Sequence, residues 1–222
     1  KVGSANTAGH LYKVNLAGQN LEYITGLEGD VAGWAISDPV CQIVYNSSLN
    51  KIYGTKETFS GGVYGGGVYS YDFNSDIIKN ETIIRSDQVT TLGSNCHGLV
   101  EGSDGNYYVM TKNGGTQGHG TILRYIPGNT SMSKVADFQN NSPNGVNLVA
   151  VGSKIYGTHF SKNNNEYMMW SLDVDQPLSG VQSFLLGTDD NTLGHLMSQS
   201  FIVDGTNIIG RTNWGGDGYA GM

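Results

Sequence analysis

A short strand-like motif recurs along the chain at intervals of about fifty residues. The clearest copies are Lys51–Thr55, Gly105–Val109, Lys154–Thr158 and Asn207–Thr212. Self-similarity at this period is typical of repeat architectures, in which each unit buries its apolar face against its neighbours. The repeat therefore constrains the fold more strongly than any local propensity does.

Each repeat divides into four strand-like runs that are separated by turn residues. In the second complete repeat, residues 97–103 form the first strand, and Asp104-Gly105 is a strong hairpin signal. The remaining strands cover residues 106–111, 121–126 and 134–138. Four-stranded antiparallel units of about fifty residues are typical of β-propeller blades.

The third strands of the repeats align with one another. They read Leu11–Val14, Val68–Tyr71, Ile122–Tyr125 and Met169–Leu172. In each of them the third residue is polar and lies between apolar neighbours, which is the period-two pattern of a strand with one fully buried face. No stretch carries a comparable helical periodicity, because Ser, Gly and Asn interrupt every candidate. The sequence therefore predicts an all-β protein.

The repeats predict one domain over residues 1–222, a four-bladed β-propeller of four-stranded antiparallel blades. Three blades cover residues of about 40–90, 96–140 and 144–190. The fourth blade is shared between the ends of the chain, at about 1–30 and 197–222. Either the two halves of one chain close a ring, or a neighbouring molecule supplies the missing half and a head-to-tail polymer forms.

The second repeat resembles the propeller repeats called Gloeo/Verruco repeats. The matching residues are Gly98–Tyr108, the pair Gly114-Gly115, and Gly120–Tyr125, with weaker copies over nearly the whole chain. Two departures are Val109-Met110, where the pattern has Gly-Thr, and Asn163–Asn165, where it has a Gly-Gly loop. The resemblance implies a secreted or surface-exposed bacterial protein of unassigned role, and it brings no catalytic residues to carry over.

Composition excludes several kinds of partner. Only 14% of the residues are charged and the net charge is −7, so we expect neither nucleic acid nor an anionic membrane surface as partner. No apolar run approaches the length of a membrane span. The printed chain begins without Met and without a signal peptide, which we interpret as a mature, processed or excised polypeptide. A surface of Asn, Ser, Thr, Gly and Tyr favours a secreted or cell-surface protein that binds sugars or other copies of itself.

The cysteines and the glycosylation sequons suit an extracellular setting. Cys41 and Cys96 lie the same distance before the equivalent residues Tyr53 and Tyr108. They therefore occupy one site in adjacent repeats, and they form a disulfide if those sites meet; two buried thiols are the alternative. Candidate N-glycosylation sites are Asn46, Asn80, Asn129 and Asn140.

No residue pattern predicts a metal, a cofactor or a catalytic centre. The five histidines show no metal-ligand spacing, and no nucleophile elbow is present. Glu101 is an acid inside a predicted strand, and a polysaccharide lyase would require His97, His195 and Arg211 to share a cleft. We therefore predict no catalytic residues.

Glycine-rich loops carry aromatic side chains at corresponding places in the repeats. These candidate binding residues are Tyr64, His119, Trp214 and Tyr219. Rings on one rim of a propeller can stack on sugars or bind the next subunit. The leading hypothesis is a secreted, non-catalytic propeller that acts as an adhesive or self-assembling scaffold. The alternatives are a glycan-binding, lectin-like propeller and a carbohydrate-active enzyme such as a lyase.

Overall fold

The chain is all-β, as its sequence predicts. The computed structural model describes residues 10–15, 17–18, 20–26, 42–57, 64–139, 148–161, 166–177, 180–188 and 195–214. These residues form three four-stranded and two two-stranded antiparallel sheets. The helices among them are two short turns between the first and second four-stranded sheets, η1 (Ser86–Gln88) and α1 (Val89–Leu92). No helix in the described ranges is long and apolar enough to cross a membrane.

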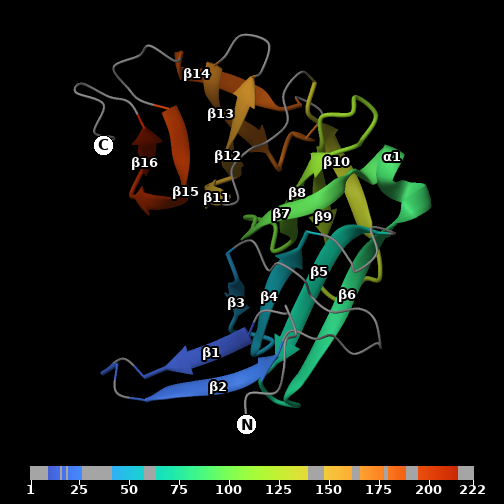
Figure 1. The fold of residues 1–222 in the computed structure, drawn as a ribbon, viewed down its shortest axis with the longest axis vertical. Coiled ribbons are helices and arrows are strands. Elements are labelled where there is room, and N and C mark those ends of the chain that lie inside the picture. Colours follow the sequence, from blue (N-terminus) through green and yellow to red (C-terminus); the bar gives the residue numbers. More distant parts are fainter. Residues whose placement is uncertain are drawn as a thin grey trace.

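Each four-stranded sheet is built from four strands that are consecutive in the sequence. The first sheet contains β3 (Val44–Asn46), β4 (Lys51–Lys56), β5 (Tyr64–Asp72) and β6 (Ile77–Arg85). The second contains β7 (Ser94–Glu101), β8 (Tyr107–Asn113), β9 (Thr121–Tyr125) and β10 (Met132–Asp137). The third contains β11 (Val149–Val151), β12 (Lys154–Ser161), β13 (Glu166–Asp173) and β14 (Gln182–Thr188). Successive sheets lie beside one another in a propeller-like arrangement (Figure 1).

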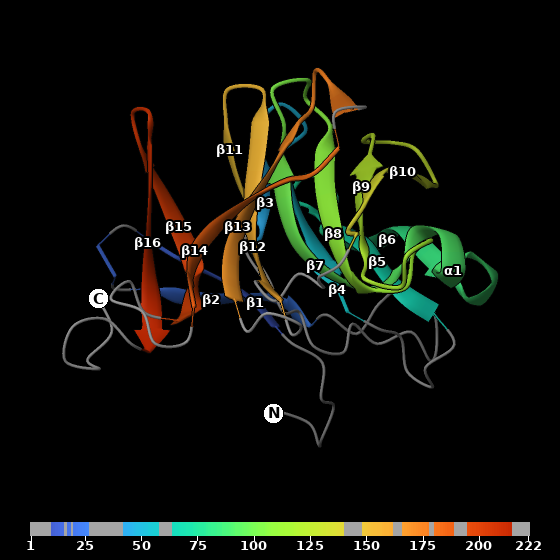
Figure 2. The same cartoon turned by 90° about the horizontal axis from the view of Figure 1, so that it is seen from above.

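The two ends of the chain form separate hairpins. β1 (His10–Val14) pairs with β2 (Leu21–Gly26), and β15 (His195–Asp204) pairs with β16 (Asn207–Trp214). The N-terminal hairpin packs on the first sheet, whereas β15 lies against β11 and β13 of the third sheet. Among the described strands, no hydrogen-bonded pairing joins the two hairpins. Figure 1 shows them at the two ends of a curved row of sheets, and Figure 2 shows the same strands from above. A fourth blade shared between them therefore stays a prediction.

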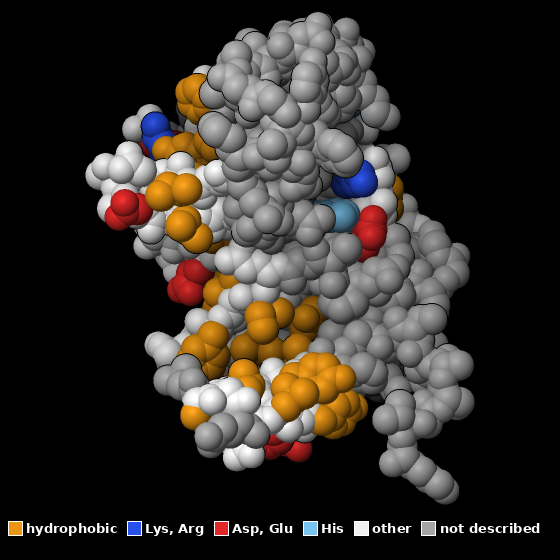
Figure 3. Space-filling model, turned by 60° about the vertical axis from the view of Figure 1, so that its left-hand side comes forward, with side chains coloured by type: hydrophobic (Ala, Val, Ile, Leu, Met, Phe, Trp, Pro, Cys, Tyr) orange, Lys and Arg blue, Asp and Glu red, His pale blue; other side chains and the backbone are white. Residues whose placement is uncertain are grey.

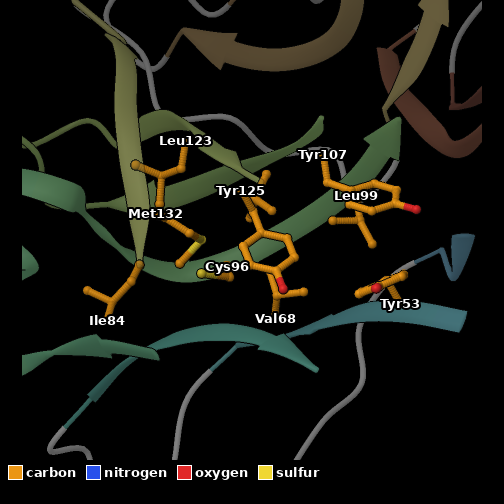
Figure 4. Packing of buried hydrophobic residues seen from close by; sticks show 10 residues of the cluster. Tyr53, Val68, Ile84, Cys96, Leu99, Tyr107, Leu123, Tyr125 and Met132 are labelled. Atoms are coloured by element: carbon orange, nitrogen blue, oxygen red, sulfur yellow. The ribbon is translucent and has the colours of Figure 1, made fainter. Parts of the chain in front are cut away.

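Tyrosines fill the interface between the first and second sheets. Tyr107 and Tyr125 of the second sheet stack on each other, and their ring planes lie 18° apart. The Tyr107 ring centroid is 4.8 Å from that of Tyr53 in the first sheet. Val68 and Cys96 are buried in the same cluster (Figure 4). One face of each sheet thus packs on the opposite face of the sheet before it.

The interface between the second and third sheets is centred on Trp170, which is fully buried. Its ring lies edge-on to Phe138, with the ring centroids 5.2 Å apart. Across the strand pair β12–β13, Trp170 lies directly opposite Gly157. A Cβ atom added to Gly157 would come within 2.5 Å of the Trp170 ring, so the ring occupies the space that the missing side chain leaves. Gly54 and Tyr69 repeat this arrangement in the first sheet.

Candidate functional site

The four candidate loop residues cannot be assembled into one site from the described side chains. Tyr64 begins β5 and Trp214 ends β16, but only their backbones are described. His119 is half-buried in the β8–β9 loop, where a bridge pairs its backbone with Gly114. Tyr219 lies outside the described residues. The expectation of an aromatic binding rim therefore stays a prediction.

The cysteine prediction is also open. Cys96 lies in β7 and is fully buried, with its Sγ atom 3.8 Å from the carbonyl oxygen of Gly65. Cys41 lies outside the described residues, so the predicted Cys41–Cys96 disulfide is a matter for experiment.

The sequon asparagines occupy different environments. Asn46 lies in β3 and donates a hydrogen bond from Nδ2 to the Tyr107 hydroxyl at 2.9 Å. Asn80 is half-buried within β6, and Asn129 is exposed in the turn after β9. Asn140 lies outside the described residues. A glycan on Asn46 would be attached to the same nitrogen that donates to Tyr107 in the interface between the sheets, whereas Asn129 is exposed.

One buried histidine pairs with a carboxylate. His97 in β7 is 7% exposed, and its Nε2 atom lies 3.3 Å from Glu57 Oε1 at the end of β4. The other ring nitrogen, Nδ1, is buried without a hydrogen-bond partner. In the described part of the chain, no group of three His, Cys, Asp or Glu side chains could hold a metal ion. Of the other residues that a lyase would need, His195 and Arg211 have no described side chains. The separate candidate acid Glu101 is exposed.

Burial lowers the pKa of His97 below its usual value, the Glu57 carboxylate partly opposes this shift, and the Lys112 charge adds to the lowering. The unfolded chain, with a histidine pKa of about 6.5, therefore takes up this proton first as the pH falls. The stabilising contribution is complete above about pH 6.5 and is lost as the pH falls below that value.

We accordingly expect the free energy of unfolding of the parent chain to fall by up to about 1.4 kcal/mol per pH unit below pH 6.5 because of His97. His97→Gln should flatten this dependence in urea titrations between pH 7 and pH 5. His119→Gln, in the β8–β9 loop, is the histidine control, because it replaces the same residue type away from Glu57. Equal slopes in all three proteins would contradict the assignment to His97.

A carboxylate that no sequence pattern predicts is buried between the first two sheets. Glu81 in β6 is 8% exposed, and its Oε1 accepts a hydrogen bond from Ser70 Oγ at 2.6 Å. Lys79 Nζ lies 3.1 Å from its other carboxylate oxygen. Burial, together with the Glu81 charge, raises the pKa of Tyr53 to about 12. The two oxygens of the buried Glu81 carboxylate therefore both have partners, Ser70 through a hydrogen bond and Lys79 through an ion pair, as a buried charged group requires.

The terminal hairpins are among the elements that expose large apolar side chains. Leu21, Tyr23, Val14 and Tyr12 on β1–β2 are 71%, 56%, 56% and 54% exposed. In the register of this hairpin, Tyr12 lies opposite Tyr23 and Val14 opposite Leu21, so all four share one face. Figure 3 shows hydrophobic side chains gathered in the lower half of the molecule, where this hairpin lies in Figure 1.

The C-terminal hairpin has a smaller face of the same kind. Ile202 and Ile209 lie opposite each other on β15 and β16 and are 63% and 47% exposed. Each end of the row of sheets therefore presents apolar side chains to solvent. Contiguous exposed apolar surface of this kind typically marks a contact site for protein or ligand.

Comparisons with known proteins extend the description of the fold. No family model and no curated protein matches the sequence. Among solved structures, an exo-β-1,3-galactanase from Phanerochaete chrysosporium, determined with galactose, superposes with a TM-score of 0.57 at 13% identity. That match covers 92% of this chain and 49% of the galactanase, so the chain spans about half the length of that protein.

Two further structures are similar. Regucalcin from Agrobacterium tumefaciens, described as a calcium-binding protein, gives a TM-score of 0.52 at 16% identity over 91% of this chain and 60% of its own. A luciferin-regenerating enzyme gives 0.51 at 11% identity, over 82% of this chain and 57% of its own. At such identities the likeness concerns the fold alone, an all-β, propeller-like arrangement of antiparallel sheets.

Proposed function

We propose that the chain is a secreted, non-catalytic structural propeller that assembles with other copies of itself. In this proposal β15–β16 and β1–β2 are the two halves of a fourth blade. The observation that carries it is the pair of exposed apolar faces at the two ends of the row of sheets. Burying such faces is the main favourable contribution to association between proteins.

Composition supports an extracellular scaffold. A chain with only 14% charged residues and 33 glycines offers few of the charged groups that keep protein surfaces apart. A sheet with unpaired edge strands is a template for pairing with another chain unless it is protected. Here β1 carries a single lysine, Lys13, which pairs with Glu22 of β2, and β16 carries a single arginine, Arg211, so the two hairpins have few of the charged side chains that usually block such pairing.

A glycan-binding propeller is the second candidate. It is favoured by the shared fold with a galactanase whose structure was determined with galactose. It is also favoured by the predicted aromatic loop residues, since tyrosine and tryptophan rings stack on sugar faces.

The first test is size-exclusion chromatography with light scattering, followed by negative-stain electron microscopy. We expect a mass above the 23.7 kDa of one chain, rising with protein concentration, and elongated particles. A mass of one chain at every concentration would contradict assembly. Retention of that monomer on immobilised β-1,3-galactan, lost on adding free oligosaccharide, would support the second candidate instead.

A further inference from the structure

In two of the complete sheets, a glycine in the second strand lies opposite an aromatic residue in the third strand. In the first sheet Gly54 lies opposite Tyr69, and in the third sheet Gly157 lies opposite Trp170. In both pairs an added Cβ would come within 2.5 Å of the aromatic ring. An aromatic side chain at this place in the third strand therefore requires glycine in the second strand.

The second sheet obeys the same rule with different residues. Its pair at this place is Val109 opposite Leu123, and both side chains are fully buried. Glycine is absent where the aromatic ring is absent. The two residues at this position thus change together, as a matched pair.

The terminal hairpins carry the two halves of one more such pair. Gly210 in β16 occupies the place of Gly54 and Gly157 in the recurring motif, and Tyr12 in β1 occupies the place of Tyr69 and Trp170. Tyr12 is 54% exposed, whereas Tyr69 is 1% exposed. A register with Tyr12 opposite Gly210 would satisfy the rule of the complete sheets.

The rest of this register also agrees with the complete sheets. It places Ile209 opposite Lys13 and Ile208 opposite Val14. At the pair Ile209–Lys13, the four residues that lie side by side across the four strands, here called a row, would be Ile202, Ile209, Lys13 and Glu22. The equivalent rows are Val44–Tyr53–Ser70–Lys79, Val100–Tyr108–Arg124–Ser133 and Val149–Tyr156–Ser171–Gln182. Every row has two apolar or aromatic residues followed by two polar ones.

The buried fractions of the residues equivalent to Val14, at the neighbouring pair Val14–Ile208, support the same register. Val14 is 56% exposed, although its equivalents Tyr71, Tyr125 and Leu172 are all buried, at 3%, 0% and 0%. Pairing with Ile208 of β16 would place Val14 in a sheet of the same form. The exposed face of the N-terminal hairpin is thus that of a half-complete sheet, whose equivalents in the complete sheets are covered by a neighbouring sheet.

We infer that β16 of one copy pairs with β1 of a second copy, with Gly210 opposite Tyr12. This inference rests on the proposed function and names its contact. Among the described strands of one chain β16 and β1 do not pair with each other, and the two hairpins pack on different sheets, Leu11 of β1 against Ile52 of the first sheet and β15 against the third. The contact joins two different surfaces, so each added copy presents a further β1 and a further β16, and the assembly grows head to tail.

Engineered cysteines test both the register and the partner. Directly opposed residues in antiparallel strands have Cα atoms about 4.5–5.5 Å apart, which a disulfide can bridge. We expect Lys13→Cys and Ile209→Cys, placed in separate chains and mixed under mild oxidation, to give a cross-linked dimer. Lys13→Cys mixed with Ile208→Cys is the control, because neighbouring strand residues point to opposite faces, and it should give at least about tenfold less dimer.

Placing both cysteines in one chain distinguishes pairing of β16 with β1 of the same chain from pairing with β1 of a second copy. A ladder of cross-linked oligomers on a non-reducing gel is the expected result. A cross-link confined to single chains would overturn the inference, because the chain would then close its own ring. Assembly without a cross-link at this register would overturn the inference while leaving the proposed function standing, whereas loss of all assembly would remove both.

A rescue experiment tests the matched pair itself. Gly210→Val should abolish the oligomers, because its side chain would meet the Tyr12 ring, and circular dichroism should show a folded monomer. Adding Tyr12→Leu recreates the Val109–Leu123 pair of the second sheet and should restore the oligomers. Thr206→Val, in the exposed turn between β15 and β16, is the control and should leave assembly unchanged. Failure of the rescue, or assembly of Gly210→Val alone, would overturn the register.

Discussion

Trp170→Ala is expected to lower the free energy of unfolding by about 3–5 kcal/mol. The indole is fully buried between the second and third sheets, against Phe138 and over Gly157. Its removal would leave a cavity that the backbone of Gly157 cannot fill. Urea titration followed by circular dichroism measures the change.

Phe184→Ala is the control for this substitution. Phe184 lies on the neighbouring strand β14 and is 50% exposed, so its truncation should cost less than about 1 kcal/mol. Similar losses in the two variants would mean that Trp170 is not the centre of the interface.

Gly120→Ala is expected to cost about 3 kcal/mol or more, or to prevent accumulation of folded protein. Gly120 has a φ angle of +90°, which L-residues rarely adopt. An added Cβ would also lie 2.0 Å from the carbonyl oxygen of Thr111, a backbone atom that cannot move aside. The Gly120 carbonyl additionally accepts a hydrogen bond from the Phe138 amide, which ties the loop to the end of β10.

Gly128→Ala separates backbone strain from steric overlap. Gly128 has nearly the same φ angle, +91°, but no atom lies within 4 Å of the place of its Cβ. Its substitution should therefore cost about 1 kcal/mol. Equal losses of stability at the two positions, measured by urea titration, would show that the overlap with Thr111 is relieved in the folded protein.

The strand pattern could be predicted because it depends on short-range rules. The polar third position of each third strand is occupied by Ser70, Arg124 and Ser171, and these residues lie at equivalent places in the three complete sheets. The predicted turn at Asp104-Gly105 is also present, with Gly105 at a φ of +73° and the Asp104 carboxylate accepting a bond from the Asn106 amide. Alternation and turn chemistry are both visible in a window of a few residues.

The interior charges could not be predicted in the same way. In the sequence, Glu81 has the pattern of an ordinary polar residue in an alternating strand. Its burial depends on Ser70 in the neighbouring strand and on the second sheet, which packs over it. His97 and Glu57 are likewise distant in sequence and meet only when β4 and β7 are brought together. Such contacts follow from how sheets stack, which the pattern within one repeat does not encode. The short helix α1 was missed because four residues carry no periodicity.

The glycine opposite each aromatic ring has a consequence for how repeats recognise one another. The sheets are built from strands of similar pattern, so a hairpin from one repeat could in principle pair at the wrong place with another. A strand that carries Tyr12 cannot pair at this position with β8, because its ring would overlap the side chain of Val109, whereas Gly210 leaves room for it. An incoming strand with a large side chain at this position would therefore be accepted by β4, β12 or β16, which carry glycine there, and excluded from β8 by steric overlap. Shape at this one position thus separates β8 from the other second strands, although all of them have similar hydrophobicity.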